Sequence, residues 1–216
     1  MKWDYEFDVV VIGSGNGALT SAICSHDGGA KTLVIEKSTQ FGGTSATSGG
    51  GVWIPNNRYA KAENVDDSDQ DARDYINSVS PEGKIKDELV ETYLSEGPKM
   101  IDYLHENTQV KYRNLQHYPD YFPDNPGGKA GNRSMEPEPI KGTELGDDLK
   151  KLREQHPQTA FTMGPINMNF TQVEGQLLLG ALPGWKSLFA KLFTKYILDI
   201  PMRLRWGWKD RRLTMG

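Results

Sequence analysis

The sequence predicts an α/β fold whose core is one strand–helix–strand unit, with helical and irregular segments added to it. Three observations support this prediction. A short β-branched run, Phe7–Ile12, leads directly into three glycines within five residues, and a second apolar run, Thr32–Ile35, follows the next helical segment. Apolar runs of this kind are typical of strands buried on both faces of a parallel sheet. A glycine turn between strand and helix is typical of a βαβ unit.

The helix of this unit is expected over Ala18–Asp27, with Leu19, Ile23 and Cys24 on one side and a stop at Gly28-Gly29. Further along, Asp66–Leu104 predicts two helices that are separated near Ser80-Pro81, the first with an acidic start at Asp66-Asp67-Ser68-Asp69. The residues available for burial there are Tyr75, Ile76, Leu89, Val90, Tyr93, Leu94, Met100, Ile101 and Leu104.

Two other stretches lack such periodicity. Gln40–Pro55 is rich in glycine and predicts a loop or several tight turns, and Tyr112–Pro139 is rich in proline, glycine and aromatic residues and predicts irregular chain. We expect three segments: residues 1–110 as the N-terminal part of a nucleotide-binding domain, 111–184 as an irregular segment that lines a site, and 185–216 as a basic amphipathic segment.

Length and composition narrow the class of protein. The 216 residues, 37% of them hydrophobic, suffice for one sizeable core, and the abrupt end after Arg212 suggests an incomplete domain. The net charge of -4 gives no indication of a nucleic-acid partner. The single cysteine, Cys24, excludes an internal disulfide, and the acidic N-terminus lacks an apolar signal segment, so we expect a cytoplasmic protein. The four histidines are scattered without ligand spacing, so no metal is expected.

The glycine turn after the first strand predicts a dinucleotide site. Gly13 allows a sharp turn, Gly15 allows the backbone to approach a phosphate, and Ala18 allows the helix to pack closely on the strand. A helix N-terminus then offers free N–H groups and its dipole to a diphosphate. A GxGxxA string alone could be only a turn, but here strand, helix, second strand and terminal acid are all present.

The acid at the end of the second strand restricts the cofactor. Glu36 follows Gly15 by 21 residues and is placed to accept hydrogen bonds from ribose hydroxyls, which favours FAD or NAD over NADP. A second glycine-rich stretch, Phe41–Gly51, can bind a further part of a long cofactor and favours FAD, although a flexible linker is the alternative. The residues expected to contact the cofactor are Gly13, Ser14, Gly15, Gly17, Ala18, Glu36, Lys37, Gly42, Gly43, Thr44, Ser45, Ser48, Gly49 and Gly50.

These residues resemble a known group, the flavoproteins of the fumarate reductase and 3-ketosteroid dehydrogenase superfamily, which bind FAD through a Rossmann-like motif. FGGTSATSGGGVWIPNN (Phe41–Asn57) and YPDY (Tyr118–Tyr121) look most like the 3-ketosteroid Δ1-dehydrogenases. Members of that family are much longer, so the resemblance implies an N-terminal portion that is inactive by itself. The positions just before the glycine-rich loop, Ser38-Thr39-Gln40, include no histidine, so the FAD is expected to be non-covalent.

The resemblance also implies a reaction. In that family a tyrosine phenolate removes a proton beside a ring ketone while hydride passes to the flavin N5, which creates a 1,2-double bond in a 3-ketosteroid. Tyr121 matches the tyrosine that assists this base, and Tyr118 and Phe122 would shape an apolar substrate pocket. The base and the enolate-binding groups would lie beyond Gly216. Without the resemblance, four aromatic residues could form a lid over a core: Tyr112, Tyr118, Tyr121 and Phe122.

The last predicted helix, Trp185–Ile197, is amphipathic, and residues 185–216 carry a local net charge of +6. With Trp185, Trp206 and Trp208, residues 185–212 are suited to an anionic membrane surface, as in some peripheral members of the family, or pack as an ordinary helix. Two other functions remain open: a fumarate reductase-like flavoprotein acting on a dicarboxylate, and a non-catalytic FAD-binding module. The sequence does not identify the electron acceptor.

Overall fold

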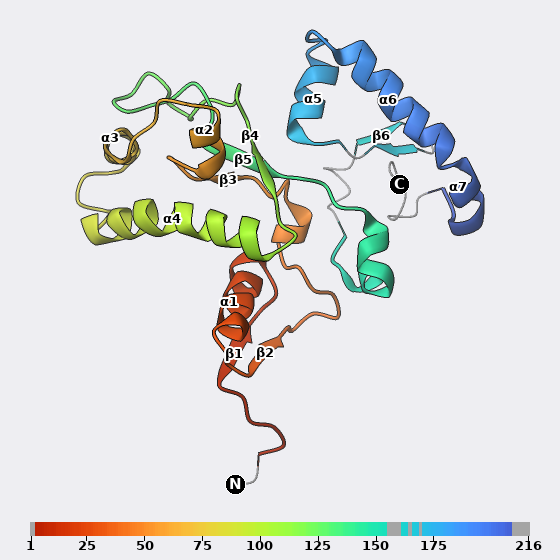
Figure 1. Ribbon diagram of the computed structural model, residues 1–216, viewed down its shortest axis with the longest axis horizontal. Helices are drawn as coiled ribbons and strands as arrows, with labels where there is room; N and C mark the ends of the chain where they lie inside the picture. The colour runs from red at the N-terminus through yellow and green to blue at the C-terminus, as the bar shows by residue number, and fades with distance from the viewer. Residues whose placement is uncertain (1–2, 155–160, 164–165, 169, 209–216) are drawn as a thin grey trace. The chain divides into compact units, whose positions relative to one another are not determined.

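The computed structural model describes residues 3–154, 161–163, 166–168 and 170–208. The chain forms two compact units: unit 1 combines residues 1–49 with 140–216, and unit 2 is the intervening stretch 50–139. Figure 1 labels the elements of both units. The three segments expected from the sequence stay a prediction of functional organisation.

The N-terminal part of unit 1 is the expected βαβ unit. Strands β1 (Val9–Ile12) and β2 (Thr32–Ile35) pair in parallel, with Val9 opposite Thr32 and Ile12 opposite Ile35. Helix α1 (Asn16–Asp27) connects them and packs on both strands (Figure 1). Its C-terminus is closed by Gly28, whose N–H donates to the Cys24 carbonyl, as the Gly-Gly stop predicts.

The strands of this unit are less covered than their composition predicts. Ile12 is 82% exposed, and Val10 and Ile35 are also exposed, because the described sheet contains only these two strands and α1 lies against it. On α1, Ala22 is the buried residue, whereas Ile23 and Cys24 are exposed. Burial of β1 on both faces is therefore wrong for the described chain.

The rest of unit 1 is mainly helical. It contains η1 (Ser45–Thr47), η2 (Gly142–Lys151), α5 (Gln172–Leu179), α6 (Trp185–Leu198) and α7 (Ile200–Trp206), with the antiparallel pair β6 (Phe161–Met163) and β7 (Ile166–Met168). Helix α6 confirms the predicted amphipathic helix and packs on α5. None of the helices within the described residues is both long and apolar enough to cross a bilayer.

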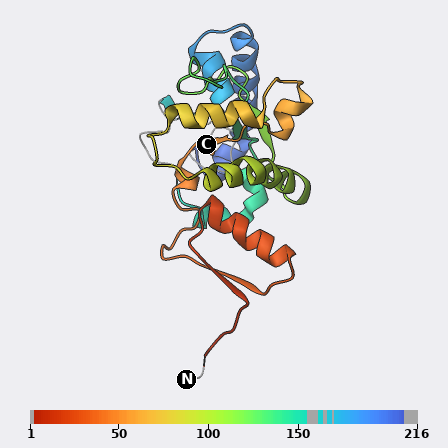
Figure 2. The ribbon, with the colours of Figure 1, turned by 90° about the vertical axis from the view of Figure 1, so that its left-hand side faces the viewer.

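Unit 2 is a small antiparallel sheet packed with helices. Its strand order is β3 (Val52–Trp53), β5 (Ser134–Pro137), β4 (Tyr112–Asn114), and the helices are α2 (Arg58–Ala62), α3 (Asp69–Val79) and α4 (Asp87–Asn107). Figure 2 shows α3 and α4 side by side, and Ala72 of α3 packs on Val90 and Leu94 of α4. The two predicted helices, with a break after Val79, are confirmed.

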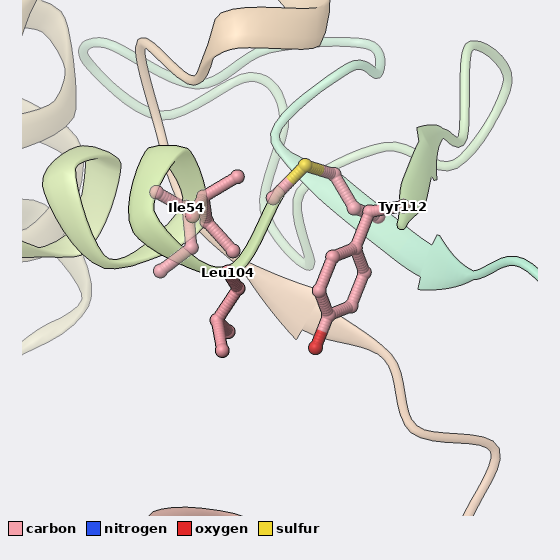
Figure 3. Packing of buried hydrophobic residues seen from close by; sticks show 5 residues of the cluster. Ile54, Leu104 and Tyr112 are labelled. Atoms are coloured by element: carbon pink, nitrogen blue, oxygen red, sulfur yellow. The ribbon is translucent and has the colours of Figure 1, made fainter. Parts of the chain in front are cut away.

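The main core of unit 2 joins residues far apart in the sequence. Ile54, Leu104 and Tyr112 meet there (Figure 3), together with the fully buried Ile101 and Met135. Strands β4 and β5 lie within the stretch predicted to be irregular, since short strands between proline-rich turns give no clear period of two. Of the candidates for burial on α4, Leu89 is 60% exposed, and Tyr93 is only partly covered, with its ring stacked on Trp53 of β3.

Candidate functional site

The turn from β1 into α1 has the backbone that its glycines predict. Gly13 has a φ of +96°, and its N–H donates to the Ile35 carbonyl at 2.7 Å, which ties the turn to the end of β2. This φ lies in the region that residues with a Cβ rarely adopt. Gly15 is extended and immediately precedes α1, so the sharp turn delivers the chain directly into the helix.

The first turn of α1 keeps two amides available. The Leu19 N–H donates to the Gly15 carbonyl at 2.9 Å, and the Asn16 N–H donates to Ser45 Oγ at 3.0 Å. The N–H groups of Gly17 and Ala18 have no hydrogen-bond acceptor among the described residues. A Cβ added at Gly17 would meet nothing within 4 Å. This end of the helix can therefore hold an anion.

The second glycine-rich stretch lies directly on this turn. A Cβ added at Gly43 would lie 3.3 Å from the Cα of Gly15, and one at Gly42 would lie 2.7 Å from the Cβ of Ala46. Gly42 and Gly43 both have positive φ, at 105° and 55°. The glycines thus allow two backbone segments, 28 residues apart, to approach each other beside the start of α1.

Glu36 lies at the end of β2, next to the same turn. Ser14 Oγ donates to Glu36 Oε2 at 2.5 Å, and the Ser38 N–H donates to Oε1 at 3.0 Å. The Ser14 hydroxyl is buried and also accepts from the Gly42 N–H at 2.9 Å. These hydrogen bonds, that from Ser14 first, lower the pKa of Glu36, so the carboxylate stays ionised. Each carboxylate oxygen retains a lone pair for a further donor.

The remaining predicted cofactor residues lie in different surroundings. Thr44, Ser48, Gly49 and Lys37 are exposed in unit 1, and the Ser48 hydroxyl donates to the Ser45 carbonyl at 2.8 Å. Gly50 belongs to unit 2, where a Cβ would lie 2.8 Å from Cγ of Pro137. Close packing therefore accounts for a glycine at position 50 without a ligand.

The described site fits the diphosphate and the ribose of an adenosine diphosphate group. The open amides of Gly17 and Ala18 suit the diphosphate, and the ionised Glu36 suits ribose hydroxyls. A metal would need different groups, and the part of the chain that the structure describes holds no cluster of three His, Cys, Asp or Glu side chains.

The aromatic residues predicted to line a substrate pocket belong to unit 2. Tyr121 is 84% exposed, Phe122 is exposed and Tyr118 is half-buried, so Tyr121 and Phe122 do not cover the core of their own unit. Tyr112, by contrast, is a member of that core. Tyr112, Tyr118, Tyr121 and Phe122 therefore do not form one lid over the core of unit 2.

Sequence reasoning missed a buried charge cluster behind these aromatic residues. Arg133 pairs with Asp67 at 2.7 Å and with Asp120 at 2.9 Å, and all three side chains are almost fully buried. Asp67 was interpreted only as part of an acidic helix start. Because the partners are 13 and 66 residues apart, no local pattern connects them.

The start of α1 offers the open amides of Gly17 and Ala18, and the ionised Glu36 lies next to it at the end of β2. This arrangement is that of a nucleotide-binding α/β protein. The family model described as "FAD binding domain" matches residues 8–189, so the chain belongs to the FAD binding domain family. Its cofactor is FAD, and the expected Rossmann-like FAD-binding core is confirmed.

Several of the similar proteins are dehydrogenases of cyclic ketones. The 3-oxosteroid 1-dehydrogenase of Mycobacterium tuberculosis is 39% identical over 76% of this chain and 28% of its own length. The 4-oxocyclohexanecarboxylate 2-dehydrogenase of Sinomonas cyclohexanicum is 37% identical over 73% of this chain and 27% of its own length. The crystal structure of 3-ketosteroid Δ1-dehydrogenase from Sterolibacterium denitrificans, in complex with 1,4-androstadiene-3,17-dione, matches with a TM-score of 0.84. It is 37% identical, and the match covers 97% of this chain and 36% of that one.

The chain thus spans about a third of the length of these relatives. The predicted resemblance to the steroid dehydrogenase flavoproteins, over part of their length, is confirmed.

Proposed function

We propose that the chain is the FAD-binding part of a dehydrogenase that introduces a 1,2-double bond into a 3-ketosteroid or a related cyclic ketone. The observation that carries this proposal is the likeness, over nearly the whole chain, to a steroid dehydrogenase whose structure contains a steroid dienone. The open amides at the start of α1 support the same proposal, because such an enzyme needs its FAD held next to the substrate.

In this proposal, the residues of the chain have separate roles in FAD binding and in the reaction. The amides of Gly17 and Ala18 hold the diphosphate, and Glu36 holds a ribose. Bound FAD supplies a two-electron acceptor for the C–H bond that is broken. The Tyr121 hydroxyl supports removal of the proton beside the ketone by hydrogen bonding to the base, and Tyr118 and Phe122 contact the apolar ring system.

Arginine usage favours a ketone over a dicarboxylate substrate. A fumarate reductase-like site requires guanidinium groups that are free to bind small carboxylates. In unit 2 every arginine is already paired with a carboxylate of the same unit; these are Arg58, Arg73, Arg113 and Arg133. The candidate pocket segment of unit 2 therefore offers no guanidinium to a dicarboxylate.

The proposal can be tested with the complete reading frame, including any coding sequence that continues after Gly216. The purified protein is supplied with a 3-ketosteroid, 4-oxocyclohexanecarboxylate or fumarate and a redox dye, and products are identified by mass. We expect a steroid product with two hydrogens fewer and a double bond beside the ketone. Turnover of fumarate alone would contradict the proposal. A flavin spectrum without turnover of any of the three would favour a non-catalytic FAD-binding module.

We further propose that residues 185–212 dock the protein on the cytoplasmic face of an anionic membrane, where an apolar ketone would be dissolved. Phe189 and Phe193 are stacked and exposed on one face of α6, and Lys191 and Lys195 are exposed on the opposite face. A helix with an exposed aromatic face and a basic face suits a lipid headgroup region. The ordinary alternative is supported by Leu192, which is buried.

Charge reversal separates these two possibilities. The double variant K191E/K195E should release the protein from vesicles that contain anionic lipid, because each basic residue near such a surface contributes about 1 kcal/mol. Vesicle flotation measures the bound fraction, and neutral vesicles are the control. Unchanged binding to anionic vesicles would contradict membrane docking through this helix.

A further inference from the structure

The loop that carries Tyr121 is anchored on both sides of that residue. We call residues 118–129 the Tyr121 loop. Within it, Tyr121 is 84% exposed, whereas the neighbouring Asp120 is 5% exposed. The side chain of Asp120 is therefore buried and that of Tyr121 lies in solvent, so the backbone conformation at these two residues determines where Tyr121 lies.

Asp120 provides the anchor on the N-terminal side. Its Oδ1 accepts from Nε1 of Trp53 at 2.6 Å, and its Oδ2 accepts from Nη1 of Arg133 at 2.9 Å and from the Lys129 N–H at 3.0 Å. The Asp120 N–H in turn donates to the Lys129 carbonyl at 3.0 Å. One carboxylate thus joins both ends of the loop to β3 and to the residue preceding β5.

Arg133 fixes this carboxylate from behind. The guanidinium makes its other hydrogen bonds to Asp67, from Nη2 at 2.7 Å and from Nε at 3.2 Å. It also lies over the rings of Trp53 and Tyr75, 5.6 and 5.8 Å from their centres. A buried charge cluster of this kind tolerates few geometries, because each group left unpaired in the interior is costly.

The C-terminal side of Tyr121 has anchors of its own. The Phe122 N–H donates to the Tyr75 hydroxyl at 3.3 Å, and the Lys129 Nζ donates to Asp71 at 3.0 Å. Gly127 lies so close to α3 that a Cβ would be 1.9 Å from the Asp71 carbonyl oxygen. The loop backbone therefore also lies against α3 on this side.

We propose that Asp120, together with Arg133, is a positioning residue for Tyr121: the buried charge cluster holds the loop so that the tyrosine hydroxyl is presented at one place. The inference rests on the proposed function, in which Tyr121 takes part in the removal of the α-proton. A displacement of about 1 Å of a group that acts on the reacting atoms can cost about a hundredfold in rate. Precise presentation of Tyr121 therefore matters for turnover more than for affinity.

A double-mutant cycle on the complete protein tests whether Asp120 acts through Tyr121. D120N should lower kcat by about tenfold and change KM by less than about twofold, whereas in a Y121F background the same substitution should change kcat by less than about twofold. Asp124→Asn is the matched control, because Asp124 is exposed on the same loop, and it should leave kcat unchanged. Equal effects of D120N in both backgrounds would overturn the proposal, since a merely structural role is additive.

A second measurement does not depend on turnover. With 3-fluorotyrosine placed at position 121, the 19F NMR spectrum should show one resonance in the otherwise unchanged protein and in the D124N variant. It should show exchange broadening or several resonances in D120N. The milder variant Trp53→Phe, which removes the donor to Oδ1 and keeps an aromatic ring next to Arg133, should move the spectrum in the same direction if D120N does not fold.

The two measurements separate two kinds of failure. Full activity of Y121F would overturn the assigned role of Tyr121 in the proposed function. A single, sharp 19F resonance in D120N and in W53F would overturn the positioning role of Asp120 itself, whatever Tyr121 does.

Discussion

At the scale of single residues, the cofactor site depends on glycines, which have no side chain to block the backbone. Gly17 faces open space at the first turn of α1, and its N–H is free for an anion. Gly43 approaches the Gly15 backbone so closely that a side chain would disturb both segments. The one acid of the site, Glu36, is oriented by Ser14, a residue buried between the two glycine-rich stretches. These positions bring a diphosphate to backbone N–H groups, where the helix dipole favours negative charge.

A carboxylate at position 17 should separate helix stability from cofactor binding. Gly17→Asp places a negative charge at the N-terminus of α1, which should leave the free energy of unfolding unchanged or raise it by about 0.5 kcal/mol. The same charge competes with the diphosphate, so the affinity for FAD should fall by at least about tenfold, the equivalent of about 1.4 kcal/mol. Flavin fluorescence titration and urea unfolding measure the two effects.

The control is Gly17→Ala, which adds a methyl group into open space without a charge. It should retain FAD binding to within a few fold. Tight FAD binding by G17D would show that the diphosphate lies elsewhere.

At the scale of secondary-structure elements, α2, α4 and β4 are joined by a polar contact. The Tyr59 hydroxyl of α2 accepts from the Tyr112 N–H at 2.9 Å and shares a hydrogen bond of 2.8 Å with Nδ1 of His105, near the end of α4. Desolvation lowers the pKa of His105, and the neighbouring charges of Arg58 and Lys111 lower it further. The neutral imidazole is therefore the form that suits the folded unit.

This contact predicts a loss of stability at mildly acidic pH. A histidine whose pKa is lowered by folding binds a proton more readily in the unfolded chain, so the free energy of unfolding should decrease as the pH falls through about 6.5, the usual value for histidine. Urea midpoints between about pH 7.5 and 5.5 measure this dependence. His105→Gln should reduce the slope, and His117→Gln, at an exposed histidine, should not. Equal slopes in both variants would exclude His105 as the source.

At the scale of the whole molecule, the two units contain different features. Unit 1 carries the glycine turn and Glu36, and unit 2 buries Ile101 and Met135 completely between α4 and the three-stranded sheet. The contacts of unit 2 close over long sequence separations, so one substitution in its core acts on the helices and strands together.

Truncation in this core should be costly. Ile101→Ala removes a fully buried side chain and should lower the free energy of unfolding by about 2–5 kcal/mol. Leu89→Ala, on the same helix but 60% exposed, should change it by less than about 0.5 kcal/mol. Urea unfolding followed by far-UV circular dichroism measures both, and similar effects of the two substitutions would contradict the packing of α4 described above.

The sequence by itself determined those features that depend on neighbouring residues. These are the βαβ unit with its glycine turn, the break between α3 and α4, and the amphipathic helix α6, because turn chemistry and helical periodicity act over only a few residues. The second glycine-rich stretch, Phe41–Gly51, and the family resemblance extended this prediction to the FAD cofactor, which the family model confirms.

Only the tertiary structure decided which distant groups meet. It brought Gly43 to Gly15, paired Arg133 with Asp67 and Asp120, and left Ile12 and Leu89 exposed, although their apolar character suggested burial. The physical reason is that burial and ion pairing depend on what the folded chain places next to a residue. A local sequence pattern indicates which kinds of contact a residue can make. Which of these contacts forms depends on the packing of the whole unit.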